Sequence, residues 1–265
     1  MRAFVEGVGL IGPGLNGWQS ARPVLAGSAP YGRAATTVPA GELLPPAERR
    51  RTGVLVRLAL AAGQEAMTQA GVNPATVATV FTSSSSDGDN LHAICESLAR
   101  PAPEISPTRF HNSVHNAAAG YWGIATRSLE RSTSLACFDG SFAAGLLEAA
   151  AQASVDRVPV GLIAYDMPYP EPLNAVRRVA ASFGVAFILL PERGGRTLAQ
   201  IDVAAVPARS GPTTMPDEEL EALRIGVPAA CSLPLLAALA RGAREALVID
   251  YLEGLQLQVS VAPCD

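Results

Sequence analysis

The sequence predicts an α/β fold in which a mixed, mostly parallel sheet is covered by helices on both faces. Segments with helical periodicity alternate with short runs of β-branched and apolar residues. Two of these runs, 158–164 and 182–190, are almost continuously apolar, which is typical of strands buried on both faces. The chain has 265 residues, 49% of them hydrophobic and 17% charged, so a disordered chain is excluded and a large core is expected.

The first quarter of the chain reads as strand, connection, helix and strand. Residues 4–11 are extended and mostly apolar and end at the turn Gly12-Pro13-Gly14. Residues 19–47 are rich in Gly, Pro, Ala and Thr without periodicity, so we expect a long irregular connection. Apolar side chains between 53 and 71 recur on one helical face, and a short β-rich strand follows at 77–82.

The middle of the chain is expected to hold short helices before the two buried runs. Residues 83–89 form a polar loop, and apolar residues spaced i, i+3, i+4 and i+7 predict a helix over 91–98. Three prolines between 101 and 107 predict an extended link. A helix rich in small residues opens in the segment Asn112–Trp122, so another element must pack closely against it. The next strand and helix are predicted at 132–137 and 142–153.

The last quarter predicts a strand, two helices and a terminal hairpin. The strand is expected at 197–207. Pro216 and the acidic residues after it suit the start of a helix, where the dipole favours negative charge. Ser232 is placed to cap a second helix over 233–241. The hairpin strands are predicted at 246–251 and 255–261.

Composition excludes several classes of function. All 20 basic residues are arginine, so lysine Schiff-base chemistry is excluded and a nucleic-acid surface of the usual kind is disfavoured. The four cysteines have no C-x-x-C spacing, so neither a zinc site nor a disulfide framework is indicated. No apolar run reaches the roughly 18 residues of a membrane span, and the first residues lead straight into a strand rather than a signal peptide. We therefore expect a soluble, cytoplasmic protein with no membrane span.

No cofactor or metal is expected from the motifs. The glycines between Gly7 and Gly12 match G-x-G-x-x-G, but they lie on the strand rather than after it, which disfavours a dinucleotide site. His111 and His115 have the i, i+4 spacing of metal ligands on a helix, but no third ligand completes a site.

Four segments in order resemble the β-ketoacyl synthase family of condensing enzymes, which have the thiolase fold. They are the opening strand Phe4-Val-Glu-Gly-Val-Gly-Leu-Ile-Gly-Pro-Gly, the helix 57–71, the segment 105–120 with Asn116-Ala-Ala-Ala-Gly120, and the strand, turn and helix of 132–149. The resemblance covers residues 3–192 and implies a truncated thiolase-like fold. Residues 1–192 would form the synthase-like core, and residues 193–265 a shortened cover within one globular unit, ending in a β-hairpin.

The departures from this family concern its catalytic residues. A condensing synthase needs a cysteine thiolate at a helix N-terminus, two downstream histidines and a lysine. An ungapped alignment from Asn116 puts Asp139 at the nucleophile position, whereas a shift of two residues puts Cys137 there. No histidine follows His115 and no lysine is present. A carboxylate held by a helix N-terminus is a poor acyl acceptor, so Asp139 implies an inert site.

The resemblance is greatest to half-length, chain-length-factor-like subunits that accompany ketosynthases in aryl polyene pathways. It implies a non-catalytic subunit that pairs with a full-length ketosynthase and helps to shape the acyl tunnel, with acyl carrier protein bound mainly through that partner. Two alternatives stay open: a small acyltransferase or thioesterase that uses Cys137, and a homodimeric module that binds carrier protein or polyene. Tyr121 and Trp122 are either interface anchors or core residues. The interface and tunnel candidates are Asn112, His115, Asn116, Ala119, Gly120, Tyr121, Trp122, Ser134, Cys137, Phe138, Asp139, Gly140, Ser141 and Phe142.

Overall fold

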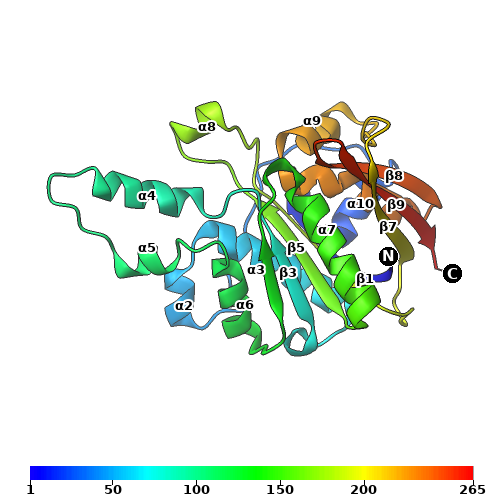
Figure 1. Cartoon of the computed structure of the whole chain (residues 1–265), viewed down its shortest axis with the longest axis horizontal. Coiled ribbons are helices and arrows are strands. Elements are labelled where there is room, and N and C mark those ends of the chain that lie inside the picture. Colours follow the sequence, from blue (N-terminus) through cyan, green and yellow to red (C-terminus); the bar gives the residue numbers. More distant parts are fainter. Residues whose placement is uncertain (265) are drawn as a thin grey trace.

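A single mixed sheet of nine strands forms the centre of the protein. In the computed structural model, which describes residues 1–264, the strands lie in the order β4-β3-β5-β6-β1-β7-β9-β8, and the short β2 pairs with β1 (Figure 1). The strands span Arg2–Gly12 (β1), Leu15–Asn16 (β2), Ala78–Thr82 (β3), Ser132–Leu135 (β4), Val160–Asp166 (β5), Phe183–Leu190 (β6), Ala199–Pro207 (β7), Glu245–Leu252 (β8) and Leu255–Pro263 (β9).

The predicted α/β class with a mixed sheet is confirmed, and the pairing directions refine it. β3 pairs in parallel with both β4 and β5, as strand–helix–strand connections require. The other pairings within residues 1–264 are antiparallel, so parallel pairing is confined to one edge of the sheet. β7 pairs with β1, so both predicted parts of the chain, 1–192 and 193–265, contribute to one sheet. The predicted C-terminal hairpin is formed by β8 and β9.

Helices cover both faces of this sheet. Leu162 and Ala164 of β5 pack on the face covered by α1, α7 and α10, whereas Ile163 and Tyr165 pack on the face covered by α3 and α6 (Figure 1). Because both faces are buried, the sequence of β5 is apolar except for its last residue, Asp166. The helices span Trp18–Leu25 (α1), Pro46–Arg51 (α2), Val54–Ala70 (α3), Gly88–Leu98 (α4), Pro107–His111 (α5), Ala117–Thr126 (α6), Ser141–Ala151 (α7), Leu173–Val176 (α8), Glu218–Gly226 (α9) and Leu233–Arg241 (α10).

The glycines of β1 let α3 lie directly against the sheet. A Cβ atom at Gly9 would overlap the backbone oxygen of Ala62, and one at Gly7 would overlap that of Ala66. The G-x-G-x-x-G pattern therefore reflects close packing of a helix on a strand.

Helices also lie where the sequence predicted irregular or extended chain. The prediction of an irregular connection over 19–47 is wrong at its start, because α1 buries Trp18, Ala21 and Leu25 on one helical face. The link before Asn112 is not wholly extended either, because Pro107 occupies the first turn of α5, where its missing N–H costs nothing.

Asn116 and the predicted cap Ser232 stand before helices without capping them through their side chains. Asn116 stands at the N-cap of α6 without a side-chain capping bond. The Ser232 hydroxyl donates to Ala229 O at 2.8 Å instead of capping α10. By contrast, Asp217 caps α9 by accepting from the N–H groups of Glu219 and Leu220.

An arm extends from the body of the protein at the left of Figure 1. We define the arm as residues 88–111, which comprise α4, α5 and the link between them. No helix in residues 1–264 is long and apolar enough to cross a membrane.

Candidate functional site

The turn between β4 and α7 holds one bulky residue in the left-handed backbone region. Phe138, the first residue of the short helix η2 (Phe138–Gly140), has a φ of 49°, which an aromatic residue adopts only where its surroundings enforce it. Ser141 Oγ donates to Phe138 O at 2.7 Å and accepts from the N–H of Cys137 at 2.9 Å, so α7 closes the turn. The apex of such a strand–turn–helix presents its side chain outward, and 62% of Phe138 is exposed.

Arg177 covers the apex of this turn. Its guanidinium carbon lies 3.6 Å from the centroid of the Phe138 ring, a cation–π contact, and its Nη2 donates to Asp139 Oδ1 at 2.6 Å. Burial lowers the pKa of Arg177, but its interactions with Asp139 and Tyr169 outweigh this and raise the pKa above its ordinary value. The guanidinium therefore stays charged and holds Asp139 in an ion pair.

A hollow of about 330 Å³ lies beside the turn, between η2 and the end of the β8–β9 hairpin. Gly140 is required there, because a Cβ atom would overlap the backbone oxygen of Tyr251. Cys137 is half-buried and lines the hollow next to an aromatic ring and a paired carboxylate. The lining residues are Cys137, Phe138, Asp139, Gly140, Ala208, Asp250, Tyr251, Leu252, Glu253 and Leu255.

A buried carboxylate fixes the loops behind this turn. Asp166 Oδ1 accepts from Ser84 N at 2.8 Å, Ser84 Oγ at 2.7 Å and Ser83 Oγ at 3.2 Å, and its Oδ2 accepts from Ala229 N at 2.8 Å. Burial raises its pKa to about 6, although these hydrogen bonds lower it. Asp166 thereby joins the ends of β3 and β5 to the short helix η4 (Pro228–Ser232), which packs against α7.

β4 leaves one edge of the sheet open. In the described part of the chain this strand pairs with β3 alone and stands at the end of the strand order. Exposed apolar side chains lie on segments that flank it in the chain or pack beside it: Ile124 on α6 (47% exposed), Leu129 in the following loop (99%) and Val155 after α7 (72%). An open edge rimmed by apolar side chains is a surface suited to a protein partner.

A sequence model of the beta-ketoacyl synthase N-terminal domain matches residues 18–251. The chain belongs to this family. No curated protein matches it significantly in sequence. The strand–turn–helix from β4 to α7 lies within the matched residues.

Solved structures share the fold of this β-ketoacyl synthase-family chain over nearly its whole length. A chain from the complex of the ketosynthase ApeO with its chain length factor ApeC from Xenorhabdus doucetiae has a TM-score of 0.74 at 21% identity, covering 98% of this chain and 99% of that one. A chain of the ishigamide ketosynthase/chain length factor has a TM-score of 0.74 at 15% identity, covering 100% of this chain and 99% of that one. A chain from AntDE:AntF, a type II PKS acyl-carrier protein in complex with its ketosynthase bound to the hexaketide, has a TM-score of 0.76 at 13% identity. The match covers 99% of this chain and 99% of that one.

The sequence left Asp139 and Cys137 open as the residue at the nucleophile position. In the structure they flank the left-handed residue, which is Phe138. Of the other candidates at the turn, Gly140, Ser141 and Phe142 are buried and Ser134 is half-buried. The arrangement thus gathers Ser134 and the candidates 137–142 around one turn.

The candidates on and before α6 form a second group. Asn112 is buried, accepts from the Tyr121 hydroxyl at 3.0 Å and donates to Arg51 O at 2.7 Å. Trp122 packs edge-on to Phe81, with ring centroids 6.2 Å apart. The burial of Tyr121 and Trp122 favours the core packing that the sequence left open. The half-buried His115 and Ala119 and the exposed Asn116 and Gly120 complete this group.

The remaining polar candidates do not form a metal centre. His115 Nε2 lies 3.3 Å from Ser83 O, while His111 is exposed on α5. Within residues 1–264, no three or more His, Cys, Asp or Glu residues are grouped to hold a metal ion. Sequence reasoning did not single out Asp166 or Arg177 as site residues.

Proposed function

We propose that the chain is a non-catalytic, chain-length-factor-like subunit that pairs with an active ketosynthase. The observation that carries this proposal is the turn at Phe138. Where a condensing enzyme of this family needs a thiolate, the apex presents a phenyl ring, and Arg177 lies over that ring while paired with Asp139. Neither a phenyl ring nor an ion-paired carboxylate accepts an acyl group from a thioester at an appreciable rate.

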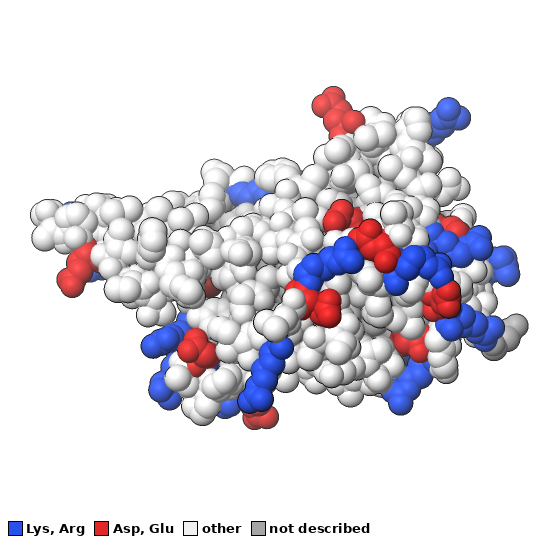
Figure 2. Space-filling model, turned by 60° about the horizontal axis from the view of Figure 1, so that its bottom comes forward, with Lys and Arg blue, Asp and Glu red and all other residues white. Residues whose placement is uncertain are grey.

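The open edge of β4 supports pairing with a second, similar subunit. An added strand would satisfy the free backbone groups of Ser132–Leu135, and Ile124, Leu129 and Val155 would be covered. In the view of Figure 2, the arm and the surface beside it carry few charged side chains, whereas charges gather at the right and along the lower edge. The weakly charged arm is thus also suited to burial in a stable interface.

The partner would supply the chemistry of decarboxylative condensation, in fatty acid, polyketide or aryl polyene synthesis. Its cysteine, histidines and lysine would bind and activate the acyl-carrier-protein substrates, and this chain would wall part of the acyl tunnel. The net charge of −4 makes direct docking of an acidic carrier protein less favourable here than on the partner.

Acylation measurements test the non-catalytic role. The complex is incubated with an acyl thioester donor, and the intact mass of each subunit is measured. We expect acyl adducts on the ketosynthase alone, and Cys137→Ala should leave turnover unchanged, like the exposed control Cys95→Ala. An adduct on this chain, or loss of turnover in Cys137→Ala with the complex intact, would favour a small acyltransferase or thioesterase.

Charge substitutions test the interface. Leu129→Asp should abolish co-elution with the ketosynthase in size-exclusion chromatography, because it places a carboxylate in the buried surface. Ile225→Asp, at a 71% exposed position on α9, is the matched control and should leave the complex intact. Equal effects of both variants would refute pairing through the β4 edge. A stable homodimer that does not bind a ketosynthase would support the binding-module alternative.

A further inference from the structure

The arm has almost no apolar core of its own. Its helix α4 lies against α5, but within residues 88–111 only Asn90 and Ile94 are buried. Every residue from Pro101 to His111 is exposed. A hollow of about 260 Å³ remains between α4 and the segment that leads to α5, with Ile94 and Ile105 among its lining residues. The arm therefore leaves most of its apolar side chains without a partner in this chain.

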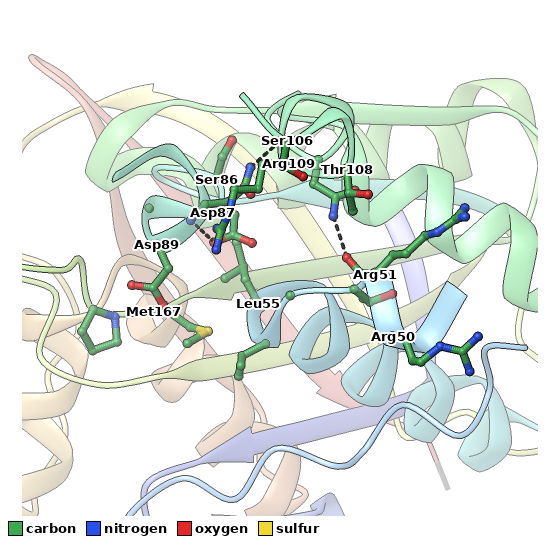
Figure 3. A pocket seen from close by; sticks show the side chains of 17 residues that line it. Arg50, Arg51, Leu55, Ser86, Asp87, Asp89, Ser106, Thr108, Arg109 and Met167 are labelled. Atoms are coloured by element: carbon green, nitrogen blue, oxygen red, sulfur yellow. Dashed lines mark hydrogen bonds between the residues drawn. The ribbon is translucent and has the colours of Figure 1, made fainter. Parts of the chain in front are cut away.

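The base of the arm joins the body through hydrogen bonds rather than through apolar packing. A cavity of about 470 Å³ lies between the start of α3 and the arm (Figure 3). At one end of the arm Asp87 Oδ1 accepts from Asn90 N at 3.0 Å, and directly after the other end Asn112 Nδ2 donates to Arg51 O at 2.7 Å. These bonds fix both ends of the arm, but they bury little apolar surface.

One face of α4 is apolar and open. The i, i+3, i+4 and i+7 spacing that predicted this helix belongs to Leu91, Ile94, Cys95 and Leu98. Leu91 and Leu98 are each 53% exposed, Cys95 is exposed, and Phe110 on α5 is 67% exposed. A stripe with this spacing normally faces a core, so α4 has the sequence of a helix that packs against a further surface.

The exposed apolar side chains continue from the arm toward the open edge of β4. Val114, just after the arm, is exposed, and Ile124 and Leu129 follow it in the chain before β4 begins. In Figure 1 the arm projects on the side of the sheet that ends with β3 and β4, opposite the side that ends with β8. A subunit that added a strand to β4 would therefore occupy the space into which the arm projects.

We propose that the arm docks on the ketosynthase partner and buries Leu91, Leu98 and Phe110 against an apolar part of its surface. This docking deepens the proposed function and rests on it, because the same partner pairs with the β4 edge. In the view of Figure 2 the arm carries few charged side chains, so its burial removes little charge from water.

The docking also stabilises the arm itself. Helices as short as α4 and α5 are marginal in water when little apolar surface is buried beneath them. In the free chain the arm therefore opens more readily than the body, and in the complex the partner supplies the missing core. Its amide hydrogens exchange faster in the free chain than in the complex.

Substitutions on α4 test the docking. In the double variant Leu91→Gln/Leu98→Gln, glutamine keeps a high helix propensity, so α4 is retained. Titration calorimetry measures the dissociation constant of the complex with the ketosynthase. The double variant should raise it about 10- to 100-fold, because two half-exposed leucines lose their burial. Ile225→Gln, at an exposed position on α9, is the matched control and should leave it unchanged.

Hydrogen exchange on the natural chain gives a second measurement. Residues 88–111 should exchange at least about tenfold more slowly in the complex than in the free chain, and the control segment α9 should not change. Equal exchange of the arm in the two states, or equal dissociation constants for the double variant and Ile225→Gln, would overturn the inference.

The two proposals fail in different ways. If Leu129→Asp disrupts the complex but the double variant binds like the natural chain, the docking of the arm fails and the proposed function stands. If no ketosynthase binds the chain at all, the proposed function fails. Slow exchange of the arm in a homodimer would then overturn the ketosynthase as its partner and assign the arm to a second copy of this chain.

Discussion

Replacement of Asp166 by asparagine should change how the stability of the protein depends on pH. The folded-state pKa of Asp166 is about 6, above the ordinary value of 3.8, because burial penalises the charged carboxylate. The native state therefore binds this proton more tightly than the unfolded state. The stabilisation is fully present below about pH 4 and is lost as the pH rises through about 6.

The magnitude follows from the pKa difference. Each pKa unit corresponds to about 1.4 kcal/mol, so a change from 3.8 to about 6 corresponds to about 3 kcal/mol. Asp166→Asn removes the ionisable group. Its amide N–H₂, however, must face a hydrogen-bond donor that the carboxylate accepted from, either Ala229 N or the donors of Ser83 and Ser84. This lost hydrogen bond lowers the free energy of unfolding by about 1–3 kcal/mol. We expect the variant to be less stable than the natural chain near pH 4 and about equally stable near pH 7.

Urea unfolding at a series of pH values measures this effect. The difference in unfolding free energy between variant and natural chain should change by about 3 kcal/mol between about pH 4 and pH 7. Asp202→Asn, which removes a more exposed carboxylate paired with Arg2, is the control and should leave the difference small and nearly constant. If the unfolding free energies of Asp166→Asn and the natural chain changed in parallel with pH, the reasoning would be refuted.

Three further predictions concern packing and thiol reactivity. Gly9→Ala should lower the unfolding free energy by about 1–3 kcal/mol, because its Cβ would overlap the oxygen of Ala62; an unchanged urea midpoint would contradict the close packing of α3. Phe142→Ala should cost about 3–5 kcal/mol, because this side chain is fully buried; a loss below about 1 kcal/mol would contradict a rigid core at α7. Burial raises the pKa of Cys231 to about 11, so iodoacetamide near pH 8 should modify the exposed Cys95 before Cys231. Peptide masses measured over time show the order of modification, and faster modification of Cys231 would contradict its burial.

The regular elements were predictable where burial leaves a repeating signal. β5 and β6 are buried on both faces, so their sequences are apolar except for Asp166 at the end of β5, and α3 shows its buried face as a helical period. α1 escaped prediction because it is short and contains Pro23, which usually excludes a helix interior. The pairing directions were also not fully predictable, because they depend on which distant strands meet.

The site could be predicted only as a region. The order of motifs located the turn after β4, but a left-handed φ at a phenylalanine has no sequence signal, so Phe138 was not distinguished from its neighbours. Asp166 is a single acid at the end of a strand, and its partners come from segments 83–84 and 229. No spacing in the sequence connects three such distant segments.

The central position of β1 has a consequence for biosynthesis. This strand is made before its long neighbours, β6, which begins at Phe183, and β7, which begins at Ala199. Residues 13–182 must therefore be made before the middle of the sheet can form, and the apolar β1 lacks these two partners during that time. We therefore expect chaperones that shield extended apolar segments to bind this chain through β1.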